Sequence, residues 1–255
     1  MTADAPHRHS VPRQPSPHLQ APGPDARRDA AAWAATPRPG VQADGRLLAD
    51  AGDGLAEALF TVAHDPDSGR PLVSDVALGI GLAGALLVAE LASGRAELRD
   101  GLVIATTNSY DGLCWQFATA LSTSPPAGPG VWLRVLADET AEWILEGLLS
   151  RKVWLIPDKT LLRRRPAPRP ADPTAAEWAA VVARNQLSAG PRATTSDAAL
   201  AGLIRALDLH HHWLRDHPGQ HEPLKAVVRR LPQDLFDLLA LVEHTIASTA
   251  LTPRS

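Results

Sequence analysis

The longest apolar run in the chain extends from Val76 to Leu91. Its 16 residues are fewer than the roughly 20 that a membrane-spanning helix needs, so we predict a helix that is buried in a protein core. Gly79, Gly81 and Gly84 give this helix a face of small residues. Because each glycine costs about 1 kcal/mol relative to alanine inside a helix, such a face is expected where neighbouring helices approach closely.

Helical spacing also precedes this run. Apolar residues recur at three- to four-residue intervals between Leu47 and Ala63, and early glycines place the start of the helix near Asp53. The sequence DPDSG at Asp65–Gly69 predicts a turn, because proline presets φ and glycine accepts a positive φ. Ser74 or Asp75 is expected to cap the long apolar helix.

Two short hairpins are predicted. The dipeptide Asp100-Gly101 separates the strand-like segments Ala96–Arg99 and Leu102–Ala105, and Asp-Gly between such segments is a strong hairpin signal. The second predicted hairpin has strands at Val153–Ile156 and Thr160–Arg163, joined by a turn at Pro157-Asp158. A Pro/Arg-rich extended link over 164–173 follows it.

Helical periodicity dominates the rest of the chain. The predicted helices are Tyr110–Leu121, Val131–Leu136, Asp138–Leu149, Ala175–Asn185, Ser196–Leu209, Glu222–Leu231 and Gln233–Ala250, with caps at Asp172 or Thr174 and at Ser196. Strands and helices do not alternate as in a parallel sheet, so the fold class is mainly α. We expect one multi-helical domain over 46–252, in which amphipathic helices surround the glycine-rich core helix, after a disordered Pro/Arg/His-rich tail over 1–45.

Catalytic signatures are not visible in the sequence. It has no Gly-x-Ser-x-Gly, no phosphate-binding Gly-Lys-Ser/Thr and no His-Glu-x-x-His, so we expect a non-catalytic protein without a cofactor. Cys114 is the only cysteine, which excludes a disulfide framework and a cysteine zinc site. The N-terminus lacks the apolar core of a secretion signal, so a cytoplasmic location is expected.

A basic segment is the strongest candidate for ligand binding. Residues 151–169 carry a net charge of +6, whereas the whole chain carries −3. Lys159, Arg163, Arg164 and Arg165 are the expected contacts for an anionic lipid headgroup or membrane surface, and Trp154 is expected to insert beside them at the interface together with Leu155 and Ile156. The alternatives are a solvated rim and arginines paired with acidic helices. The sequence pI of about 6.4 argues against nucleic acid.

A histidine cluster offers a weaker metal hypothesis. His210–His212 precede His217 and His221, and the last two have the spacing that binds zinc on one helical turn. However, Pro218-Gly219 lies between them and breaks the helix that would align their rings. We therefore expect a polar helix end and no metal site.

The sequence from Leu55 resembles the Golgi phosphoprotein 3 family, in particular its compact actinobacterial members. The resemblance covers roughly residues 53–250 and is carried by LAEALF, DPDSGRPL, LGIGLAGALLVAEL and GRAEL at 55–60, 65–72, 78–91 and 94–98. Further on, the family order recurs in EGLLSRKVWLIPDKTLL and DAALAGLIRALDL. The resemblance implies a mostly helical domain and peripheral membrane binding through phosphatidylinositol 4-phosphate. For eukaryotic members it implies Golgi retention of glycosyltransferases through their cytosolic tails.

The resemblance also indicates where family members hold the lipid. Their pocket uses a tryptophan in the turn before the glycine-rich helix, where this chain has Leu72 and Val73. It uses an arginine in the glycine-rich run, near Ala83, and two arginines on the helix before the second hairpin, which here reads Asp138–Glu142 (DETAE). An acidic helix repels a phosphate, so Arg163–Arg165 are the expected anion contact in this chain.

The sequence thus supports a peripheral, phosphoinositide-binding-like membrane protein. The alternative is a protein-binding adaptor without lipid specificity that uses a groove lined by the small-residue helix and the tryptophans. The protein could also form an oligomer in which copies of the chain meet through the second predicted hairpin.

Overall fold

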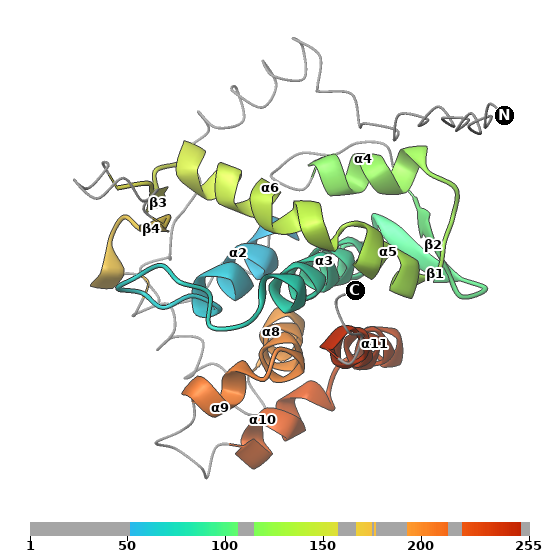
Figure 1. Ribbon diagram of the computed structural model, residues 1–255. Coiled ribbons are helices and arrows are strands. Elements are labelled where there is room, and N and C mark those ends of the chain that lie inside the picture. Colours follow the sequence, from blue (N-terminus) through green and yellow to red (C-terminus); the bar gives the residue numbers. More distant parts are fainter. Residues whose placement is uncertain are drawn as a thin grey trace, which may run out of the picture. The chain divides into compact units, whose positions relative to one another are not determined.

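The glycine-rich segment forms helix α3 (Asp75–Ala92), around which the other helices pack. The computed structural model describes residues 52–106, 115–157, 167–174, 176, 193–213 and 221–250. The predicted tail over 1–45 and the residues Lys159 and Arg163–Arg165 lie outside this part. In Figure 1, α3 occupies the centre, and α2, α5, α6, α8 and α11 all contact it.

Helix α3 begins at the predicted cap. The Ser74 hydroxyl accepts a hydrogen bond from the Ala77 N–H at 3.3 Å, and the helix is buried continuously from Leu78 to Glu90. By length and composition α3 could cross a membrane, but 72% of it is buried inside the protein. The prediction of a buried core helix is therefore confirmed.

The small-residue face of α3 is covered by neighbouring helices. A Cβ atom added at Gly79 would lie 2.1 Å from the carbonyl oxygen of Ala137, and one added at Gly84 would lie 2.6 Å from the side chain of Val242. This confirms the predicted close approach. Other helices of the same domain fill this face at Gly79 and Gly84, so a partner cannot reach it there, and the adaptor function stays a prediction.

The structure confirms most predicted helices, with shifts of a few residues at their ends. The helices around α3 are α2 (Gly52–Val62), α4 (Trp115–Thr123), α5 (Pro129–Val135), α6 (Ala137–Ser150), α8 (Thr195–Ala206), α9 (Leu209–Trp213), α10 (His221–Val228) and α11 (Gln233–Ala250). Only Ala176 of the predicted helix over 175–185 is described, and the first residues of the predicted helix over 110–121 also lie outside the described part.

The predicted helix over 196–209 is wrong in two respects. It begins one residue earlier, because Thr194 and not Ser196 is the N-cap and forms a capping box with Asp197. It also breaks at Asp208, whose φ of 60° ends α8 and starts the short helix α9. The apolar spacing continues through this break, so periodicity alone could not reveal it.

The first hairpin matches its prediction. Strand β1 (Ala96–Arg99) pairs antiparallel with β2 (Leu102–Ala105), and Arg99 lies opposite Leu102. Both turn residues have positive φ, 54° at Asp100 and 76° at Gly101. This is the conformation that the Asp-Gly dipeptide favours in a two-residue loop.

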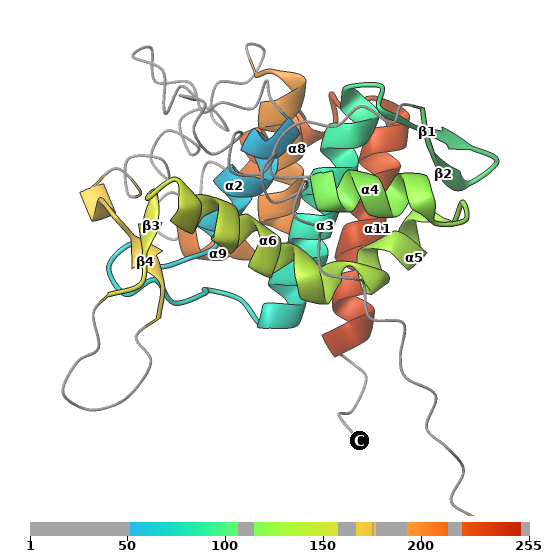
Figure 2. The same cartoon turned by 90° about the horizontal axis from the view of Figure 1, so that it is seen from above.

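The second strand pair has a partner that the sequence did not predict. Strand β3 (Trp154–Leu155) pairs antiparallel with β4 (Arg169–Pro170), and the predicted partner strand over 160–163 lies outside the described residues. The physical reason is a contact distant in sequence. Gly69, with a φ of 66°, packs directly on the backbone of Pro168, so the turn between α2 and α3 holds β4 beside β3. Figure 2 shows this turn running next to both strands.

Candidate functional site

The connection between α6 and β3 brings the start of the basic segment onto the surface of the helical core. Arg151 is the C-terminal cap residue of α6, and its guanidinium forms an ion pair with Glu57 of α2 at 2.5 Å. Both side chains are largely covered. Arg151 therefore follows the second alternative from the sequence, in which arginines of the basic segment pair with acidic residues of the helices.

An exposed apolar patch follows directly. Val153, Leu155 and Ile156 are exposed by 47%, 44% and 57%. The exposed Lys152 directly precedes them in the connection from α6, and the exposed Arg169 of β4 lies opposite Leu155. We call these five residues the docking patch. Apolar side chains surrounded by cations are the composition expected of a surface that meets an anionic membrane.

Trp154 points the other way. Successive side chains of a strand alternate between its faces, so exposure of Val153 and Leu155 places Trp154 toward the core. The tryptophan is only 1% exposed, and its ring meets Phe60 and His64 edge to face at 5.0 and 5.1 Å. The expectation that this ring inserts at a membrane interface is therefore wrong. Its exposed neighbours Val153, Leu155 and Ile156 can still contact a membrane.

His64 completes this aromatic cluster. Its Nδ1 donates a hydrogen bond to the Phe60 carbonyl at 2.6 Å, and the two rings lie 4.2 Å apart. Burial lowers the pKa of His64 below its usual value of 6.5, against weaker opposing effects of that carbonyl and of Asp75. The imidazole is thus neutral at physiological pH, and Nε2 carries a lone pair with no hydrogen-bond partner in the described part of the chain.

The turn between α2 and α3 is ordered by its own hydrogen bonds. The side chain and the backbone N–H of Ser68 both donate to Asp65, at 2.7 and 2.8 Å, and they hold the pKa of Asp65 below its usual range. The Leu72 N–H donates to Ala63 and ties the end of the turn to α2. The turn can therefore serve as a fixed wall.

A cavity of about 300 Å³ lies between this turn, the ends of α2 and α3, α6 and the two short strands. Phe60, His64 and Trp154 form its aromatic side, and Asp75 and Glu142 add two exposed carboxylates. Among the described lining residues there is no lysine or arginine. We call this the acidic cavity, and it is suited to bind a cation better than a phosphate.

The acidic cavity uses the elements that the family resemblance indicates for a lipid pocket. The turn before α3 contributes Pro71, the start of α3 contributes Leu78, and α6 contributes Ala141 and Leu145. Ala83 is fully buried in α3 and does not line the cavity. Of the positions that the resemblance indicates, Ala141 and Glu142 line the cavity, whereas Leu72 and Val73 do not. The charge of the described lining is opposite to the one a phosphate needs.

Several of these site residues were not predicted from the sequence. Phe60 and His64 lie four residues apart, a spacing that any helix can have and that does not indicate a site. The sequence indicates Asp75 only as a possible helix cap. Glu142 belongs to the acidic stretch that the sequence did point out. Their common function as a cavity wall depends on the contact between the α2–α3 turn and β4, which no local pattern contains.

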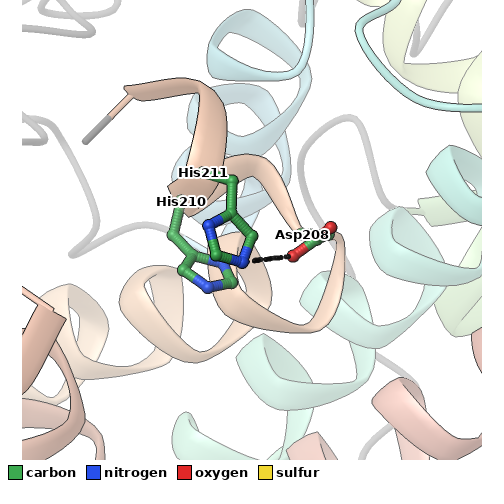
Figure 3. Close-up of side chains that lie close together, drawn as sticks. All are labelled: Asp208, His210 and His211. Carbon is green, nitrogen blue, oxygen red and sulfur yellow. Dashed lines mark ion pairs between the residues drawn. The ribbon is translucent and has the colours of Figure 1, made fainter. Parts of the chain in front are cut away.

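Part of the histidine cluster lies within the described residues, where it consists of Asp208, His210 and His211. Figure 3 shows the rings of His210 and His211 close together, with the Asp208 carboxylate beside His211. The two ring centroids lie 4.1 Å apart with tilted planes, and the carboxylate is 3.7 Å from Nδ1 of His210 and 3.4 Å from Nε2 of His211. The three ligand atoms lie within 4.8 Å of one another, close enough to share an ion. His217 and the side chain of His221 lie outside the described residues, so the predicted zinc spacing is not tested.

Comparison with known proteins assigns the chain at the level of a family. No curated protein matches the sequence significantly. The sequence model of Golgi phosphoprotein 3 (GPP34) matches residues 55–248, a range that contains α3, both strand pairs and the acidic cavity. The described helical fold and this match over most of the chain show that the protein belongs to the Golgi phosphoprotein 3 family.

Proposed function

We propose that this protein is a non-catalytic peripheral membrane protein of the cytoplasm that binds anionic lipid surfaces through the docking patch and the basic residues Lys159 and Arg163–Arg165. The observation that carries the proposal is the exposure of Val153, Leu155 and Ile156 between basic residues. Membership of the Golgi phosphoprotein 3 family supports it, because the resemblance to that family implies peripheral membrane binding.

Two physical contributions act together in this proposal. Each lysine or arginine near an anionic surface contributes about 1 kcal/mol, and this attraction weakens as salt screens it. Insertion of Leu155 and Ile156 removes apolar surface from water and does not depend on salt. A protein that uses both contributions binds reversibly and favours membranes that are rich in anionic lipid.

Phosphatidylinositol 4-phosphate is the ligand that the family resemblance implies. In this chain we place its phosphates on the basic segment, because Asp75 and Glu142 make the acidic cavity unfavourable for them. Recognition is then mainly electrostatic. Vesicles with phosphatidylinositol 4-phosphate and vesicles with phosphatidylglycerol at equal surface charge are therefore expected to bind the protein to a similar extent.

Vesicle sedimentation tests the proposal. Ile156→Ser is expected to weaken binding to phosphatidylglycerol vesicles severalfold. The change removes an apolar side chain that is 57% exposed in the free protein and would insert into the membrane. Val135→Ser is the matched control, since Val135 on α5 is exposed by 61% and lies outside the docking patch. Equal losses in both variants, or no loss in either, would contradict the proposed orientation.

A protein-binding adaptor is the second candidate. Val131 and Val135 lie one helical turn apart on α5 and are both exposed, so α5 presents an apolar face of its own. A partner protein captured by the wild type but not by Val135→Ser, with vesicle binding unchanged in that variant, would favour the adaptor.

A further inference from the structure

We propose that the acidic cavity binds a primary ammonium group, the chemistry that free ethanolamine shares with the headgroup of phosphatidylethanolamine. The lipid as the source of this group rests on the membrane docking proposed above. The ammonium site itself does not, because it is argued from the lining of the cavity alone.

The charge of the cavity selects a cation. Asp75 from the first turn of α3 and Glu142 from α6 bring two carboxylates to one space of about 300 Å³. The described lining residues include no lysine or arginine whose positive charge could offset the two carboxylates. The buried His64 is neutral and does not offset them either. A cation is therefore attracted and an anion repelled.

The aromatic side of the cavity suits an organic ammonium ion. Phe60, His64 and Trp154 are fixed by mutual ring contacts of 4.2 to 5.1 Å, so this wall is formed before any ligand binds. Ammonium groups are attracted to the faces of such rings, most strongly to tryptophan, when water is excluded. The same wall gives the methylene groups of an aminoalcohol an apolar contact.

The hydrogen-bond acceptors favour a primary amine over a quaternary one. His64 is only 7% exposed, and its Nδ1 proton is committed to the Phe60 carbonyl, which leaves Nε2 as an acceptor without a partner among the described residues. Together with Asp75 and Glu142 this makes three acceptors. A primary ammonium group offers three N–H donors, whereas choline offers none.

The neighbourhood of the cavity favours a membrane lipid as the source. Trp154 lines the cavity while Leu155, the next residue of β3, belongs to the docking patch. Likewise Pro168 lines the cavity and Arg169 is exposed beside it. With an ammonium group in the cavity, the headgroup phosphate, two carbons away, is drawn to the basic residues of the docking patch.

Titration of the full chain with soluble amines tests the site. Ethanolamine, followed by NMR chemical shifts, is expected to bind at least about tenfold more tightly than choline, because only ethanolamine satisfies the acceptors. The double variant Asp75→Asn/Glu142→Gln is expected to lose at least about tenfold in ethanolamine affinity. Glu146→Gln, an exposed carboxylate of α6 that does not line the cavity, is the matched control and should bind as the wild type does.

Vesicles test the source of the ammonium group. The wild type should prefer phosphatidylglycerol vesicles that contain phosphatidylethanolamine over those that contain phosphatidylcholine, and Asp75→Asn/Glu142→Gln should lose this preference while still binding both. The variant Arg163→Gln/Arg164→Gln/Arg165→Gln should bind ethanolamine normally yet lose vesicle binding. If that variant kept full vesicle binding, the proposed function would fail while the ammonium site stands.

Three results would overturn the inference. The first is equal affinity of the wild type for ethanolamine and choline, and the second is unchanged ethanolamine binding in Asp75→Asn/Glu142→Gln. The third is binding of a lysine-containing peptide without binding of ethanolamine, which would assign the acidic cavity to a protein partner. Ethanolamine binding without a preference for phosphatidylethanolamine vesicles would overturn the lipid as its source.

Discussion

His64 shows how one buried side chain links the stability of this protein to pH. Burial lowers the pKa of His64 from 6.5, whereas the unfolded chain takes up a proton near that value. The histidine therefore stabilises the folded state above pH 6.5, and this contribution is lost as the pH falls through the lowered pKa. Between the two pKa values the loss is about 1.4 kcal/mol for each pH unit.

The variant His64→Phe isolates this contribution. It keeps an aromatic ring beside Trp154 but cannot take up a proton. The free energy of unfolding in urea, measured between about pH 7.5 and pH 5, is expected to fall less steeply for the variant than for the wild type. Identical slopes in both proteins would show that His64 has the same pKa in the folded and the unfolded chain, which contradicts the lowered pKa.

At the scale of the element, the glycines of α3 set the distance to its neighbours. Gly79→Ala would place a Cβ atom 2.1 Å from the carbonyl oxygen of Ala137, which is backbone and cannot rotate away. The expected result is a loss of about 1–3 kcal/mol in stability, despite the better helix propensity of alanine. Gly130→Ala in α5, where the nearest atom is 3.7 Å away, is the control and should be neutral or stabilising by up to about 1 kcal/mol. A neutral Gly79→Ala would contradict the close packing of α3 against the start of α6.

Elements held by local interactions were the predictable part of the fold. The Asp100-Gly101 turn and the Ser74 cap determine their structures within a few residues, so the first hairpin and the start of α3 follow from sequence. The pairing of β3 with Arg169–Pro170 depends on packing against Gly69, about a hundred residues earlier in the chain. No local pattern contains such a contact, so the sequence did not predict this pairing.

The candidate site divides in the same way. The exposure of Leu155 and Ile156 agrees with the predicted apolar contact beside the basic segment. Leu155 lies on the outer face of β3, and Ile156 follows the end of the strand. The alternation of side chains along β3 also buries Trp154, and no sequence pattern indicates which face of this short strand meets the core. The acidic cavity joins Asp75 to Glu142 across two helices, so only the assembled fold could bring these carboxylates together.

At the scale of the whole molecule, charge and apolar exposure are expected to orient the protein on a membrane. The chain carries −3 overall and +6 within 151–169, so an anionic surface attracts this segment and repels the rest. Removing three of its charges in Arg163→Gln/Arg164→Gln/Arg165→Gln should cost about 3 kcal/mol, or roughly a hundredfold in partition coefficient at low salt.

Salt separates this electrostatic attraction from apolar insertion. Raising the ionic strength from about 0.05 M to about 0.5 M shortens the screening length severalfold, so the wild type and the triple arginine variant should converge in their binding to phosphatidylglycerol vesicles. The binding that remains should depend on Ile156, so Ile156→Ser should lower it at either salt concentration. If the arginine variant were instead weaker by the same factor at both concentrations, its effect would not be a screened attraction, and the arginines would have to contact a specific headgroup directly.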